Sequence, residues 1–161
     1  MSKQKVKIIP EKIHLVSVNI IKANLEASDD FLDSPQKIGA FEFGIANEVA
    51  HNFEEGRARF RLYFTLDARD EEENPLGVKV EYGIEFHFLV ENFQDFIHEV
   101  KKDSTQVDIA LGATLFGMAY STARGIIFER TRGTFFDGII LPVIDPFKFL
   151  LKEKEEKKAG K

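Results

Sequence analysis

Four histidines are the side chains of this chain best suited to acid–base or metal chemistry: His14, His51, His87 and His98. None has a second histidine or a carboxylate at the spacing that places two metal ligands on one face of a helix. His51 and His87 could lie near each other across a sheet, although single histidines on strands are usually structural. The chain has no cysteine, glycine-rich phosphate loop, nucleophile elbow or dinucleotide fingerprint. We therefore expect a protein that is not an enzyme, with no catalytic residue, metal or cofactor.

Binding of apolar groups is better supported, because the segment between two helix patterns is rich in apolar residues: Phe135, Phe136, Ile139, Ile140, Leu141 and Val143. A loop in a soluble domain is normally polar, since it runs over the surface. This loop is either buried or part of a surface that holds something apolar. In the second case we expect Phe136, Ile139, Ile140 and Leu141 to be exposed contacts, and Phe135 and Pro142 to set the course of the loop.

Composition limits the class of protein. The 161 residues are 43% hydrophobic and 30% charged, which is typical of a single soluble globular domain, here 1–161. Sixteen phenylalanines indicate either a phenylalanine-rich core or an apolar groove lined by rings. The net charge of −5 argues against nucleic-acid binding. No signal peptide or membrane-spanning window is evident, so we expect no membrane insertion and a cytoplasmic location.

The first half of the chain, 5–91, predicts an antiparallel sheet. Apolar residues alternate with polar ones in 41–49, 58–66 and 78–90, whereas 13–25 has apolar residues on both parities. Short turn-rich segments join the later strands, which favours hairpins. One face of such a sheet is apolar and needs a cover.

The second half, 92–158, predicts helices. Asn92 is placed to cap a short amphipathic helix from Phe93 to Lys102, and Asp103 or Ser104 to cap a longer one that ends near Arg130. Asp145 and Pro146 mark the start of a last helix. The charged tail 152–161 is typical of a solvated, fraying end.

Small residues recur every four positions along the long helix: Ala113, Gly117, Ser121 and Gly125. Glycine lowers helix stability by roughly 1 kcal/mol relative to alanine, so the repeat indicates that small residues are needed there for packing. Either the stripe lies flat on the sheet, or it is a helix-to-helix contact between subunits. The apolar character of this helix on nearly every side favours oligomerisation.

Four short motifs follow one another in this half: Leu111-Gly112-Ala113, Ala123-Arg124, Arg132-Gly133-Thr134-Phe135, and Leu141-Pro142-Val143 followed by Phe147. Their order and spacing resemble the C-terminal half of the SecB protein-export chaperones. The resemblance implies an α+β fold: a four-stranded antiparallel sheet with a long helix, a crossover loop and a C-terminal helix. It also implies a dimer of dimers, a homotetramer assembled through the long helix. Its function would be to hold unfolded precursor polypeptides without ATP and pass them to the SecA motor.

Two features depart from the family pattern. Ser121 and Gly125 stand where the family often has a proline and an acid. Near the place where family members dock SecA stand Glu81, Gly83 and Glu85, so Glu81 and Glu85 are the candidate docking residues. SecB-like relatives also serve toxin–antitoxin systems, which makes a toxin–antitoxin pair the alternative partner. Other hypotheses are a carrier of a small apolar ligand and a purely structural oligomer.

Overall fold

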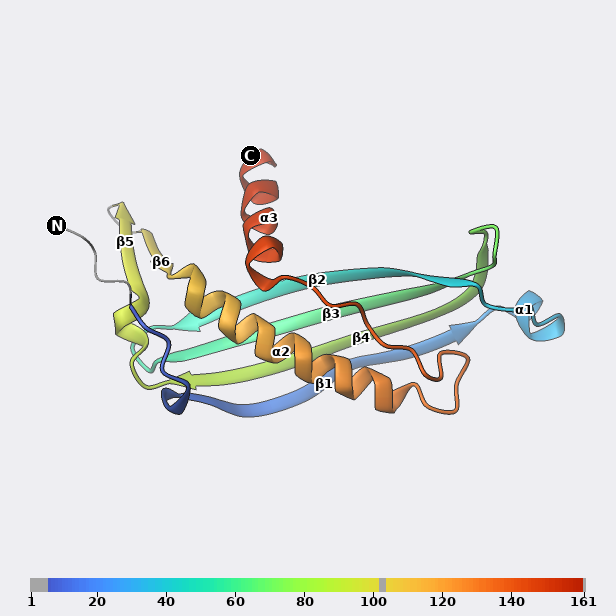
Figure 1. Cartoon of the computed structure of the whole chain (residues 1–161), viewed down its shortest axis with the longest axis horizontal. Coiled ribbons are helices and arrows are strands. Elements are labelled where there is room, and N and C mark those ends of the chain that lie inside the picture. The colour runs from blue at the N-terminus through green and yellow to red at the C-terminus, as the bar shows by residue number, and fades with distance from the viewer. Residues whose placement is uncertain (1–5, 102–103, 161) are drawn as a thin grey trace.

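The computed structural model describes residues 6–101 and 104–160, which form a four-stranded antiparallel sheet with helices on one face (Figure 1). The fold is α+β, as predicted. In chain order its elements are η1 (Pro10–Lys12), β1 (Ile13–Ala27), α1 (Asp29–Asp33), β2 (Ala40–Asn52), β3 (Arg57–Arg69), β4 (Pro75–Val90), η2 (Phe93–Phe96), β5 (Ile97–Lys101), β6 (Ser104–Val107), α2 (Ile109–Arg130) and α3 (Pro146–Ala159).

The strand order is β1-β4-β3-β2, and all neighbours are antiparallel. The period-two pattern sets the two faces, because successive side chains of a strand point in opposite directions. Phe60, Leu62 and Phe64 of β3 are fully buried on the face that α2 covers. Arg59 and Arg61, which alternate with these residues in sequence, lie on the opposite, outer face.

The edge strand β1 explains why its apolar residues occupy both parities. Its register with β4 shifts at two β-bulges, between Leu15 and Ser17 and between Ile20 and Lys22. An extra residue at a bulge reverses the parity of the residues that follow. Val16 and Ile21, the extra residues, are exposed. The strand is therefore one-sided with two bulges, whereas the sequence indicated two apolar sides.

The predicted amphipathic helix from Phe93 to Lys102 is wrong. Phe93–Phe96 is a single 3-10 turn, and Ile97–Lys101 pairs with Ser104–Val107 as a small hairpin. Phe93 and Phe96 are buried, but Val100, which completed the helical spacing, is exposed. Lys102 and the predicted cap Asp103 lie outside the described residues.

The long helix α2 starts later than predicted. Ser104 lies in β6, and the cap is Asp108, whose carboxylate accepts a hydrogen bond from the Ala110 backbone N–H at 2.8 Å. The end at Arg130 agrees with the prediction. α2 lies along the sheet, with Leu115, Phe116 and the other residues of its inner side in the core.

The last helix begins as predicted. The Asp145 carboxylate accepts hydrogen bonds from two backbone N–H groups, and Pro146 is the first helical residue. The helix continues through the charged tail to Ala159 and projects away from the sheet (Figure 1). No helix in the described part of the chain is long and apolar enough to cross a membrane.

Candidate functional site

The helix α2 ends in a hydrogen-bonded turn that reverses the chain. The Thr131 hydroxyl is buried and donates to the Ile127 carbonyl at 2.8 Å, and the Thr134 hydroxyl donates to the Thr131 carbonyl at 2.6 Å. Gly133 has φ +74°, a left-handed conformation that glycine adopts at little cost, and its N–H donates to the Asp137 carboxylate at 3.2 Å. The Arg-Gly-Thr-Phe sequence therefore forms the turn that starts the crossover loop.

Two loop residues anchor the crossover loop (135–143) in the core. Phe136 is 0% exposed and Leu141 is 2% exposed. The Phe136 ring packs on Phe41 of β2, with ring centroids 5.1 Å apart. The expectation that Phe136 and Leu141 are exposed contacts is wrong, because their burial joins the loop to the sheet and to the core.

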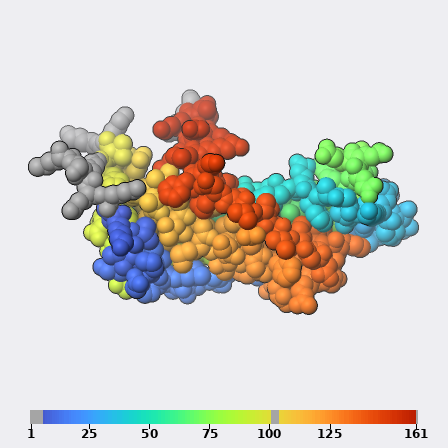
Figure 2. Space-filling model, in the orientation of Figure 1, coloured from blue at the N-terminus to red at the C-terminus, as the bar shows by residue number. Residues whose placement is uncertain are grey.

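The backbone of the loop is bound to α2. The Arg124 Nε–H donates to the Leu141 carbonyl at 3.0 Å, and the Tyr120 hydroxyl donates to the Pro142 carbonyl. Carbonyl groups with fixed donors cannot move without losing those bonds. The loop therefore holds one course beside α2, between it and β2 (Figure 2).

Most of the remaining apolar residues of the loop are exposed. Ile140 is 69% exposed and Val143 is 82% exposed, while Ile139 is partly buried. Phe135, which we expected to set the loop's course, is about half exposed, and its ring makes an edge contact with Phe31 at 5.2 Å. The loop is therefore buried in part and forms an exposed apolar surface in part: Phe136 and Leu141 are buried, whereas Ile140 and Val143 are exposed.

Exposed apolar residues continue onto neighbouring elements. Phe147 and Leu151, one turn apart on α3, are about half exposed. Phe41 and Val49 of β2 are also exposed, and β2 has no strand partner on its outer edge among the described residues. We call Phe135, Ile140, Val143, Phe147 and Leu151 the exposed apolar set.

A pocket of about 240 Å³ lies between β2, the start of α2 and α3. Its apolar lining includes Val49, Phe60, Val107, Ile109 and Leu150. The pocket therefore lies beside the end of β6, with residues of β2 and α3 on its other sides.

Asn47 and Glu153 supply the polar atoms of this pocket. Asn47 is 9% exposed, and its Nδ2 donates to the Glu153 carboxylate at 3.3 Å. The Asn47 Oδ1 is buried without a hydrogen-bond partner among the described residues. Burial raises the pKa of Glu153. We missed both residues from sequence, although Asn47 interrupts the apolar parity of Phe41, Phe43, Ile45 and Val49.

The histidines do not assemble a site. His51 stacks on Phe53 on the helix-covered side, and burial lowers the pKa of His51. His87 lies on the outer face, so the sheet separates the two rings. Within the described ranges, no three His, Asp or Glu side chains are grouped as a metal would require.

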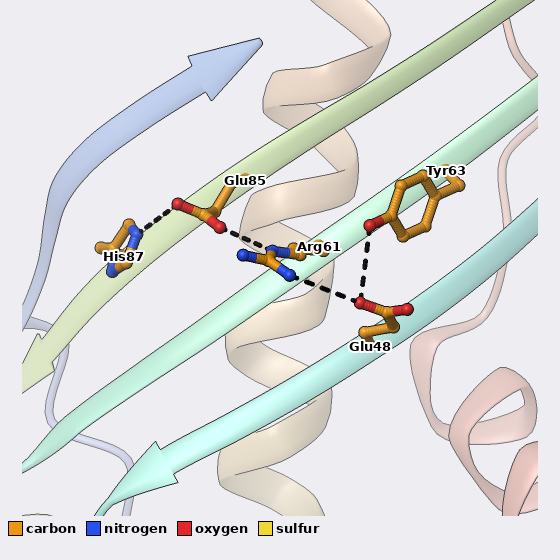
Figure 3. Close-up of polar contacts among 5 residues, drawn as sticks. All are labelled: Glu48, Arg61, Tyr63, Glu85 and His87. Atoms are coloured by element: carbon orange, nitrogen blue, oxygen red, sulfur yellow. Dashed lines mark hydrogen bonds and ion pairs between the residues drawn. The ribbon is translucent and has the colours of Figure 1, made fainter. Parts of the chain in front are cut away.

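The two candidate docking acids are both held by cations. Glu81 pairs with Lys22 and Lys79, each at 2.9 Å, and these hydrogen bonds, the one from Lys79 first, lower the pKa of Glu81 to about 2. Glu85 contacts Arg61 at 2.6 Å and His87 at 2.7 Å (Figure 3). Their charges are therefore engaged within the outer face.

The small-residue stripe divides into two halves. Ala113 is buried, and a Cβ on Gly117 would lie 3.4 Å from Pro146 Cγ of the same chain. Ser121 is exposed, and a Cβ on Gly125 would have no neighbour within 4 Å. Gly117 thus faces Pro146 of its own chain, while Ser121 and Gly125 remain open for a subunit contact.

Of the comparisons with known proteins, the one with solved structures identifies the fold of this chain. No family model and no curated protein matches the sequence. Among solved structures, a SecB-like chaperone of Mycobacterium tuberculosis, in complex with a ChAD peptide from an antitoxin, matches with a TM-score of 0.57 and 9% identity. The match covers 83% of this chain and 91% of that one. This chain therefore has a SecB-like fold, with a four-stranded sheet, a long helix, a crossover loop and a last helix.

Proposed function

We propose that this protein is an ATP-independent chaperone that holds unfolded segments of other polypeptides on the exposed apolar set. The observation that carries the proposal is the division of the crossover loop. Phe136 and Leu141 fix it in the core, while Ile140 and Val143 are held outward at 69% and 82% exposure. Apolar side chains that a fixed backbone holds in solvent form a surface that can bind apolar groups of a partner.

The energetics suit a client of unspecified sequence. Each apolar client side chain that becomes fully buried contributes about 1.5–3 kcal/mol, so several partial contacts give useful affinity. The free edge of β2 would add backbone hydrogen bonds that do not depend on the client sequence. A loop already fixed by Arg124 and Tyr120 loses little conformational freedom on binding.

A carrier of one small apolar ligand is less well supported. Ligand pockets are commonly about 300–1,000 Å³ and enclose most of the ligand. The pocket beside Asn47 measures about 240 Å³, and the strongest apolar exposure lies outside it, on the loop and α3. This arrangement favours an extended chain.

Two classes of client are consistent with the surface. The leading one is unfolded precursor polypeptides held for export and passed to the SecA motor. The second is a segment of an antitoxin, which is favoured by the antitoxin peptide bound to the structural neighbour. A homo-oligomer, formed as a dimer of dimers, would place several such surfaces on one assembly.

The test is aggregation of a denatured client protein diluted into buffer without ATP, followed by light scattering. We expect the unmutated protein to suppress aggregation and the double variant Ile140→Ser/Val143→Ser to suppress it several-fold less. Val100→Ser, at an exposed apolar site on β5 away from the loop, is the control and should keep full activity. Equal suppression by all three proteins, or binding of the folded client as well, would overturn the proposal.

The antitoxin alternative is tested separately, with a purified antitoxin segment and an unrelated unfolded client in competition. A preference for the antitoxin segment of about tenfold or more would favour the second class. Equal competition by the two peptides would favour the first class, unfolded precursor polypeptides in general.

A further inference from the structure

The outer face of the sheet carries three arginines on one strand. Arg57, Arg59 and Arg61 alternate along β3, so their side chains share the face opposite α2. Figure 3 shows Arg61 on this face, with α2 on the far side of the strands. No described helix or loop packs over it. In a chain with net charge −5, this is a local concentration of cations.

Two glutamate side chains of this face lie close to Arg61. Its guanidinium contacts Glu85 at 2.6 Å and Glu48 at 3.8 Å, and the Tyr63 hydroxyl also donates to Glu48 at 3.5 Å (Figure 3). Glu85 in turn contacts His87. Two glutamates are thereby engaged around one arginine.

Arg59 has a different environment. Its cross-strand neighbours are Ala50 on β2 and His87 on β4, and neither is an acid. Arg59 makes no ion pair with any described residue, and its Nε is buried without a hydrogen-bond acceptor. A buried charged donor without an acceptor is costly, so the site favours a ligand that supplies one.

Open space lies beside Arg59. A hollow of about 250 Å³ is lined by Ala50, His51, Asn52, Arg57, Ala58, Arg59, His87 and Phe88. Arg57, Arg59 and His87 present their ionisable side chains on this outer face, and no carboxylate of the described residues lines the hollow. Arg59 itself lines the hollow, together with the small side chain of its cross-strand neighbour Ala50.

We propose that this hollow binds a carboxylate from an acidic segment of a partner protein. A guanidinium fork matches the two oxygens of a carboxylate, and Arg57 at the rim adds attraction. Arg57 pairs with Glu55 at 3.3 Å, an exposed contact that contributes little and exchanges easily. The hollow opens on an uncovered sheet face, which suits a protein segment better than a metabolite that needs enclosure. The site lies on the opposite face from the exposed apolar set, so it stands independently of the proposed function.

The experiment measures binding of a fluorescent hexaglutamate peptide to the full-length protein by anisotropy, with hexaglutamine as the neutral probe. We expect hexaglutamate to bind and hexaglutamine not to bind. Arg59→Gln should weaken hexaglutamate binding about tenfold. Arg132→Gln is the matched control, because it also removes one positive charge, from an arginine that pairs with Glu129 at the end of α2. It should leave binding unchanged.

Three outcomes would overturn the proposal: no preference for hexaglutamate, equal weakening by both variants, or displacement of the peptide by inorganic phosphate at equal concentration. The last result would assign the hollow to a small anion. If Arg59→Gln fails to fold, the Nε–H resonance of Arg59 in the unmutated protein provides the test by NMR. It should shift on addition of hexaglutamate and not on addition of hexaglutamine.

Discussion

At the residue scale, the burial of Glu153 in its pocket disfavours the negative charge of its carboxylate. Burial raises its pKa above the ordinary value of 4.5, so the folded chain disfavours the ionised form. The stability contributed by the neutral carboxyl is present below pH 4.5 and is lost as the pH rises through the folded pKa. We therefore expect Glu153→Gln, which can still accept the Asn47 hydrogen bond, to raise Tm at pH 7 and to change it little at pH 4.

The control for this variant is Glu155→Gln on the same helix, an exposed residue. Thermal unfolding by circular dichroism at the two pH values measures both. A rise for both variants would indicate a general effect of charge on α3 and would contradict the role given to burial.

The pKa of Glu81 is shifted in the opposite direction to that of Glu153. Its folded pKa of about 2 lies below the ordinary 4.5, mainly because Lys79 and Lys22 donate hydrogen bonds to the ionised form. This stabilisation is present above pH 4.5 and is lost as the pH falls through about 2. Glu81→Gln should lower Tm slightly at pH 6, and the difference should shrink toward pH 2. A constant difference across this range would show that packing, not charge, accounts for the effect.

At the scale of elements, the crossover loop combines core and surface residues in one short segment. Phe136→Ala should cost about 3–5 kcal/mol in the free energy of unfolding, because it empties a fully buried site. Ile140→Ala should stay within about 0.5 kcal/mol, since its side chain is mostly in solvent. Urea unfolding measures both, and similar costs for the two would contradict the division of the loop.

The sequence was enough to predict the sheet, the turns and the two principal helices, because these follow from local periodicity. It was also enough to single out the crossover loop, whose composition is unusual for a surface segment. Which loop residues point inward depends on Tyr120, Arg124 and Phe41, which are distant in sequence. Composition alone therefore assigned exposure to Phe136 and Leu141, and the structure reverses it.

Two other elements were beyond prediction for related reasons. The bulges of β1 depend on its register with β4, so parity alone indicated a two-sided strand. The β5–β6 hairpin was taken for a helix because Phe93, Phe96, Ile97 and Val100 have helical spacing. That spacing arises from two buried rings in a 3-10 turn and one strand residue that packs on the core.

At the scale of the whole molecule, the exposed half of the small-residue stripe remains a predicted subunit contact. Met118 and Phe128 of α2 are exposed near Ser121 and Gly125, which leaves an apolar helix surface uncovered within one chain. Gly125→Arg should weaken assembly by crowding this surface. The monomer fold should persist, since a Cβ there meets nothing within 4 Å and arginine favours helix by roughly 1 kcal/mol over glycine.

Sedimentation velocity measures the assembly, with Arg132→Gln as a variant outside the contact. A monomer for the unmutated protein at micromolar concentration would remove the basis of the prediction. Gly117→Leu would be a poor probe of the contact, because the larger side chain would meet Pro146 of its own chain.

The strand order also has a consequence for the time course of folding. β2, β3 and β4 follow one another and pair as successive hairpins, but β1 pairs only with β4, and the contact between His14 and Glu91 spans 77 positions. Pairs this distant in sequence close late, because the entropy lost in closing the loop must be offset first. During synthesis, β1 emerges first and must wait for its partner with Val18 and Ile20 unprotected. A chain that we propose to hold unfolded segments of others would thus itself pass through a stage in which its first strand needs the same protection.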